Sequence, residues 1–260
     1  MKNKVKLPLI AVLGMVMAFL MAACVFNIDD GGSQYGIDPY IGKKTAVVSG
    51  EQVWIRNQYA TKISQAYLQY NGSPAPLKVF VFKPAEPKYE KISVGSGQIL
   101  NGILDFGIEN LEGKTDLSGW EAEKLSFFKS IFSMYWKNVQ ITPDSTEGYM
   151  ILLETPSDML DRQGLFGTAS TISCETILYI YVNENCTISG EANQGYIPGQ
   201  YYYRTDGNLH LSLREGLNLV CRRETYGTDF SGSAVISMSI RNPIKNPENY
   251  KWVIELGYVF

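Results

Sequence analysis

Short runs of alternating apolar and polar residues begin near Thr45 and recur to the end of the chain. Leu77, Val79 and Val81, for example, occupy alternate positions in the run 77–83. A period of two is typical of a β-strand with one buried face. Glycine, proline and asparagine separate the runs, as expected of turns. The pattern predicts strands at residues 46–49, 52–56, 65–70, 77–83, 98–108, 148–153, 176–182, 199–204, 208–213, 217–222, 234–240 and 252–256.

One predicted strand does not alternate. Every residue from Ile177 to Val182 is apolar. A strand without a polar face is stable only when both of its faces are covered. We therefore expect residues 176–182 to be buried on both sides.

Residues 208–213 and 217–222 predict a β-hairpin. Each strand has a single apolar face, formed by Leu209, Leu211 and Leu213 in the first and by Leu217, Leu219 and Cys221 in the second. A three-residue loop at 214–216 would pair these faces and end on Gly216, where glycine tolerates a positive φ. His210, the only histidine of the sequence, then points to the opposite, solvent-facing side, and no metal or catalytic role is supported for it.

Residues 119–135 break the strand pattern and predict one amphipathic helix. Aromatic residues recur there at helical spacing, and Ser118 followed by Glu121 matches a capping box. A stripe of this kind most often packs into a core. We expect the helix to pack on the N-terminal half, although a ligand groove or a contact with a bilayer would use the same stripe.

These elements predict a mainly β protein with one or two antiparallel β-sandwich-like domains. A polar, glycine-bearing stretch beyond residue 154 is the best candidate for a boundary between domains. It would divide the folded part into a β-rich domain with one helix at residues 45–160 and an antiparallel β domain at residues 165–260. Glycine-rich residues 24–44 would form a flexible tether.

The N-terminus has the layout of a secretory signal. Lys2, Lys4 and Lys6 precede an apolar run that ends at Ala23, just before Cys24. A spanning helix needs roughly 20 apolar residues, so a retained membrane helix is a weaker reading of this run. An ordinary secretory signal with a chance cysteine is the other alternative.

The residues before Cys24 resemble a known processing site. Met21-Ala22-Ala23-Cys24 is similar to the lipobox of bacterial lipoproteins, with methionine where leucine is usual. The resemblance implies a signal peptide at residues 1–23 and lipidation of Cys24. Stable anchoring takes more than one acyl chain, and a lipoprotein cysteine carries three, so the anchor would hold the protein at a membrane outside the cytoplasm. The outer membrane or the cell surface is the expected location.

The net charge of the chain limits the partners that it can be expected to bind. The formal net charge of the whole chain is -3, and loss of residues 1–23 makes it more negative because that segment holds three lysines and no acid. No basic cluster is present, so nucleic acid is not an expected partner. A protein or a glycan is the candidate partner, and tyrosines such as Tyr201, Tyr202 and Tyr203 could stack against it. Tyrosines in strands are more often half-buried residues of the sheet, which is the alternative for these three.

With Cys24 lipidated, three cysteines remain, which cannot pair completely within one chain. Cys186 and Cys221 form the candidate disulfide, because both lie in the same predicted domain and Cys221 faces inward. Cys174 would then be a free thiol. Three reduced, buried cysteines are the alternative.

The sequence contains no recognisable catalytic motif. Nucleophile elbows, phosphate loops, dinucleotide-binding glycines, paired histidines and Cys-x-x-Cys are missing, so we predict no cofactor, no metal and no catalytic residue. An enzyme is not the favoured reading. Two carboxylates brought together by the fold could still make a hydrolase, since such pairs need not be close in sequence.

Two segments of the C-terminal half resemble uncharacterised β-rich lipoproteins of treponemes. These are residues 181–190 and 209–218, which comprise a strand pair and its turn. The resemblance implies no known activity. Together with the lipobox, it favours a non-enzymatic binding or structural module of the envelope. The alternatives are a hydrolase acting on envelope polymers and an outer-membrane β-barrel, the latter suggested by alternating apolar residues up to the terminal Phe260.

Overall fold

The computed structural model describes residues 40–57, 65–84, 89–111, 128–168, 171–196, 202–228, 234–241 and 249–255. All of them belong to one compact unit that spans residues 36–260. Strands predominate among them, which confirms the mainly β prediction. The expected signal peptide, the lipidation site and most of the tether lie outside the described residues.

The described part of the chain forms the following strands, numbered in chain order. They are β1 (Ala46–Arg56), β2 (Tyr67–Gln69), β3 (Ala75–Pro84), β4 (Tyr89–Leu100), β5 (Ile103–Ile108), β6 (Lys137–Thr142), β7 (Gly148–Glu154), β8 (Met159–Thr168), β9 (Thr171–Val182), β10 (Cys186–Glu191), β11 (Gln194–Tyr196), β12 (Tyr202–Thr205), β13 (Leu209–Leu213), β14 (Gly216–Thr228), β15 (Ala234–Arg241) and β16 (Lys251–Glu255).

Eight of these strands close into a barrel. Their order is β9-β7-β3-β4-β5-β1-β16-β8, and β8 pairs again with β9 to complete the ring. Register shifts between β1 and β5 and between β3 and β4, of the kind that β-bulges produce, help such a sheet to curve. The sequence had suggested sandwich-like domains, and a sandwich is not confirmed. The expected boundary near residue 160 falls inside β8, and strands from both sides of it belong to this barrel.

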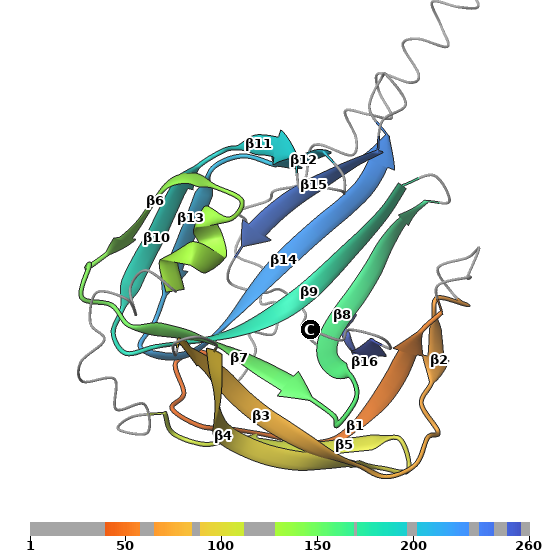
Figure 1. The fold of residues 1–260 in the computed structure, drawn as a ribbon. Coiled ribbons are helices and arrows are strands. Elements are labelled where there is room, and N and C mark those ends of the chain that lie inside the picture. The colour runs from red at the N-terminus through yellow and green to blue at the C-terminus, as the bar shows by residue number, and fades with distance from the viewer. Residues whose placement is uncertain are drawn as a thin grey trace, which may run out of the picture. The chain divides into compact units, whose positions relative to one another are not determined.

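The sheet continues beyond the barrel. At β9 it extends through β14, β15, β12 and β11, while β13, β10 and β6 form a separate three-stranded sheet. Figure 1 shows β14 and β15 running beside β9, with the three-stranded sheet and a short helix on the other side of β14.

Two hydrophobic clusters result, which we call the barrel core and the second core. The barrel core draws apolar side chains from all eight strands of the ring and from β14. Trp252 lies within it, stacked on Tyr179 with ring centroids 6.0 Å apart and edge-to-face with Phe106 at 5.4 Å. The second core joins the three-stranded sheet to β9, β14 and β15.

β9 and β14 form a wall between the two cores. On β9, Tyr179 and Tyr181 belong to the barrel core, whereas Ile180 and Val182 belong to the second core. On β14, Leu219 faces the barrel core and its neighbour Val220 faces the second core. The prediction that 176–182 is buried on both faces is confirmed. The reason is that each face of β9 meets a different core.

The predicted hairpin of 208–213 with 217–222 is wrong. β13 pairs with β10, and β14 pairs with β9 and β15, because their leucine faces pack into different cores. At 214–216 the chain therefore crosses from one sheet to the other. Gly216 does have the expected positive φ, and the Asn218 amide closes the turn by donating to the Arg214 carbonyl. The alternation within β13 is as predicted, and His210 is exposed.

Residues 98–108 form parts of two strands, not the single strand predicted. β4 and β5 pair as a hairpin across Asn101 and Gly102, both of which have positive φ as a tight two-residue turn requires. The alternation of β5 is as expected, with Leu104, Phe106 and Ile108 buried. Strands β6, β8, β10 and β11, and residues 89–97 of β4, were not predicted.

The helix is much shorter in the described residues than predicted. Residues 128–133 are helical, and the earlier part of the expected helix, 119–127, lies outside the described residues. Phe128, Phe132 and Trp136 are buried in the second core, so the described part of the aromatic stripe is core. It packs mainly against strands of the C-terminal half, not on the N-terminal half as predicted. Besides these aromatic residues, the second core takes two or three residues each from β6, β9, β10 and β13 and one each from β14 and β15.

The wall makes a test possible on adjacent residues of β14. Leu219→Ala should lower the free energy of unfolding by about 2–5 kcal/mol, and Val220→Ala by about 1.5–3 kcal/mol, because both side chains are buried. In a strand with one solvent-facing side, only one of two neighbours would show such a loss. Urea denaturation followed by circular dichroism measures both. The matched control is Val47→Ala, which changes a side chain that is 70% exposed and should alter stability by no more than about 0.5 kcal/mol.

Candidate functional site

A buried carboxylate lies on β9, two residues before the apolar run of residues 177–182. Glu175 is 1% exposed. Residues two apart along a strand share a face, so Glu175 points to the same side as Ile177 and Tyr179, the barrel side. Strand register places Arg223 of β14 directly opposite Glu175.

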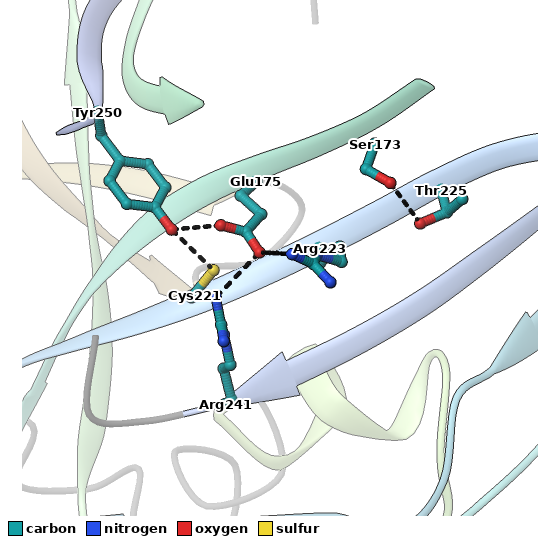
Figure 2. Close-up of polar contacts among 7 residues, drawn as sticks. All are labelled: Ser173, Glu175, Cys221, Arg223, Thr225, Arg241 and Tyr250. Carbon is teal, nitrogen blue, oxygen red and sulfur yellow. Dashed lines mark hydrogen bonds and ion pairs between the residues drawn. The ribbon is translucent and has the colours of Figure 1, made fainter. Parts of the chain in front are cut away.

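Both oxygens of Glu175 are bound. Arg223 donates to Oε1 through Nε at 2.7 Å and Nη2 at 2.6 Å, and Arg241 donates to the same oxygen through Nη2 at 3.0 Å. The Tyr250 hydroxyl donates to Oε2. Figure 2 shows the three donors converging on the carboxylate from β14, β15 and the segment before β16, with Cys221 Sγ 3.8 Å from the tyrosine oxygen. We call these five residues the Glu175 cluster.

Burial sets the protonation of the neutral members of the cluster. It raises the pKa of Tyr250, and the nearby Cys221 and the hydrogen bond to Glu175 raise that pKa further. The pKa of Cys221 is raised by burial and by the charge of Glu175. Tyr250 is therefore a neutral hydrogen-bond donor at physiological pH, and Cys221 is a thiol, not a thiolate nucleophile.

A second polar group lies on the opposite face of β8 and β9. Gln163, 1% exposed, donates through Nε2 to Glu255 Oε1 at 2.6 Å. Its carbonyl oxygen lies 3.7 Å from Cys174 Sγ, the donor of that contact. Arg56 Nη1 lies 3.7 Å from the same Glu255 oxygen. The Gln163 side chain also forms a hydrogen bond with the Asp161 carboxylate. We call these residues the Gln163 cluster.

The pKa of Asp161 in the Gln163 cluster is shifted. Burial raises the pKa of Asp161 to about 6, and the nearby Glu255 adds to the shift, while Arg222 and the hydrogen bond to Gln163 oppose it. Asp161 pairs with Val253 across β8 and β16, so it is a diagonal neighbour of Glu255 on the same face. The fold thus brings together two carboxyl groups that are far apart in sequence.

The residues singled out from the sequence fall in several places. Cys24 and Tyr201 lie outside the described residues. Cys174, Cys186 and Cys221 are free and buried. Cys186 belongs to the second core and Cys221 to the barrel core, so the structure does not bring the candidate disulfide pair together.

The tyrosines of β12 are half-buried. Tyr203 packs edge-to-face with Tyr135 at 6.0 Å, and its hydroxyl lies 3.2 Å from Asn193 Nδ2. The Tyr202 hydroxyl donates to Gln194 Oε1 at 2.6 Å. Tyr203 thus packs against a residue that follows the helix, and Tyr202 bonds the neighbouring strand β11.

Sequence reasoning missed both polar clusters. One signal was available for Glu175, which continues the inward series of Tyr181, Tyr179 and Ile177 at a spacing of two. A charge at an inward position of a strand buried on both faces requires a buried partner. No comparable signal marks Asp161 or Glu255, because their positions on one face follow from the pairing of β8 with β16.

The described residues contain no group of three or more His, Cys, Asp or Glu side chains placed to bind a metal. No helix within the described ranges is long and apolar enough to cross a membrane. Comparison with protein-family models, with curated proteins and with solved structures found no match.

Asp161 should make stability depend on pH. Its pKa is about 6 in the folded protein and near 4 in the unfolded chain, so the folded state binds more protons between these values. This contribution is present below pH 4 and is lost as the pH rises through 6. We expect Asp161→Asn to raise the free energy of unfolding at pH 7.5 and to have little effect at pH 4.

Urea denaturation at the two pH values measures this difference. Asp144→Asn, at an exposed aspartate, is the control and should show no such pH-dependent gain. An Asp161→Asn effect that is equal at both pH values would contradict the assignment.

Proposed function

We propose that this chain is a lipid-anchored protein of the cell envelope whose β unit is a non-enzymatic binding or structural module. The lipobox-like residues before Cys24 support the anchor. Acyl chains on that cysteine would hold the protein at the outer membrane or the cell surface. The resemblance of two C-terminal segments to β-rich lipoproteins of treponemes agrees with this setting.

The observation that carries the non-enzymatic role is the state of Glu175. A general base needs a lone pair that can accept a proton from a substrate. Two guanidinium groups and a hydroxyl already occupy both oxygens of Glu175. This carboxylate is suited to fixing three strands and a loop together, and it supports a structural or binding surface in preference to catalysis.

The distribution of apolar and polar side chains between the inside and the outside of the barrel favours an anchored module over strands that cross a bilayer. A transmembrane barrel turns an apolar band outward to lipid. Here the interior is apolar, and polar side chains such as Lys78, Lys91, Ser96 and Gln98 are exposed. A protein or glycan partner would meet this polar exterior.

Replacement of Cys24 tests the anchor. The Cys24→Ser variant should leave the membrane fraction and enter the aqueous phase of a detergent phase separation, because it lacks the acylated thiol. Mass spectrometry of the wild-type protein should show acyl groups on Cys24. The matched control is Cys186→Ser, at a buried thiol within the second core, which should stay with the detergent phase. A Cys24→Ser protein that also stays there would contradict the lipid anchor.

A hydrolase acting on envelope polymers is the second candidate, favoured by the pairing of Asp161 and Glu255. Asp161 has a raised pKa, as suits a general acid. Diagonal neighbours across paired strands lie about 7–8 Å apart at the backbone, a spacing compatible with an acid and a base flanking one bond. The Arg56 and Gln163 contacts of Glu255 weigh against it as a free base.

This second candidate is tested by turnover of envelope glycans with the purified full-length protein. If the pair is catalytic, Asp161→Asn and Glu255→Gln should each reduce turnover at least a hundredfold, because one partner of the acid–base pair is lost. Asp158→Asn on the neighbouring turn is the control. No turnover by the wild-type protein, or turnover that survives both changes, would exclude the hydrolase.

A further inference from the structure

We infer that the Glu175 cluster binds a tetrahedral oxyanion, of the phosphate or sulfate type, through Arg223 and Arg241. This assignment deepens the binding role proposed above and depends on it only for the idea that the β unit meets a ligand. It is carried by the geometry and charge of the cluster, not by the lipid anchor.

The two guanidinium groups are held close together. Arg223 Nη2 and Arg241 Nη2 both lie within 3.0 Å of Glu175 Oε1, so they are no more than twice that distance apart. A single oxyanion can span such a gap with two of its oxygens. The buried carboxylate fixes both groups before any ligand arrives, which reduces the entropy lost on binding.

The charge of the cluster is unbalanced. Two arginines face one carboxylate, and Tyr250 is neutral, so one positive charge remains. The other acid next to this part of β14, Glu224, lies on the opposite face and pairs with Arg222 at 3.3 Å. Among the described contacts, Glu175 is the only carboxylate that bonds Arg223 or Arg241. An added anion would restore neutrality.

Donors remain available on the solvent side. Glu175 engages Nε and one Nη of Arg223, although a guanidinium has five N–H groups. The side chains of Arg223 and Arg241 are 44% and 53% exposed, so these remaining donors are not sealed within the core. Arginine presents such donors in a rigid fork that suits phosphate and sulfate.

A pair of hydroxyl groups extends the same face. Ser173 and Thr225 are cross-strand partners one step beyond the Glu175–Arg223 pair, and their oxygens lie 2.9 Å apart. Figure 2 shows this pair beside Arg223. One hydroxyl donates to the other, so the second keeps a hydrogen for a ligand. Donors from three strands favour a tetrahedral anion with several oxygens over a planar carboxylate.

The test is isothermal titration of the full-length protein in detergent with inorganic phosphate, with sulfate, with a sugar phosphate and with acetate. We expect saturable binding of the tetrahedral anions with a dissociation constant of about 1 mM or tighter, and weaker binding of acetate. Arg223→Gln and Arg241→Gln should each weaken binding about tenfold or more, since each removes charge-assisted hydrogen bonds. Tighter binding of the sugar phosphate than of free phosphate would identify a phosphorylated glycan as the source.

Two further variants keep the result interpretable. Arg204→Gln is the matched control, because Arg204 is 60% exposed and pairs with Asp206 at 3.8 Å, outside the cluster. Its phosphate affinity should change less than twofold. Arg223→Lys keeps the charge, and so the fold, but lacks the fork; its affinity should fall between those of the wild type and Arg223→Gln.

The inference is overturned if the wild-type protein binds none of the anions, or if Arg204→Gln weakens binding as much as the cluster variants do. It is also overturned if Arg223→Lys and Arg223→Gln match the wild type. Membrane fractionation of the same proteins reports separately on the anchor. Failure of anion binding and failure of the proposed function are thus distinguishable.

Discussion

The structure depends on the burial of β9 and β14 on both faces. A strand in this position must be apolar on each side, and residues 177–182 meet that requirement without interruption. The barrel core on one side and the second core on the other are then stabilised by the same two strands. Truncation of a side chain on either face of these strands would leave a cavity. The wall therefore couples the stability of the barrel to that of the three-stranded sheet. As a result, both halves of the chain form one unit.

The same wall explains why a carboxylate is buried at Glu175. At Glu175, two residues before Ile177, the inward face of β9 is no longer apolar, yet the side chains of Tyr250, Arg223 and Arg241 still cover it. A lone charge there would be costly, and the two arginines with the tyrosine hydroxyl offset that cost. The resulting contacts join segments separated by 48, 66 and 75 residues, so the cluster fastens the last strands to the barrel.

Much of the local structure could be predicted from alternation, but the pairing could not. The buried faces of β5 and β13 and the two-sided burial of β9 follow from residue type alone. The leucines of β13 and β14 looked like one hairpin because their spacing matches, whereas they belong to different cores. The sequence of β8 suggested a domain boundary because it is polar and contains glycine, yet its polar residues Arg162 and Gln163 are buried. Their burial is made possible by partners on distant strands, which a local pattern does not contain.

The candidate site could be predicted from the sequence even less well, because the register of paired strands brings its residues together. Arg223 is opposite Glu175 only because β14 pairs with β9 in one particular alignment, and Arg241 follows from the pairing of β15 with β14. That alignment satisfies the buried carboxylate and at the same time leaves one guanidinium charge in excess at the solvent side. A bound oxyanion would balance this charge and would stabilise the folded state, because ligands that bind only the native protein shift its unfolding equilibrium. The interaction that completes the core is therefore also the one that can take a ligand.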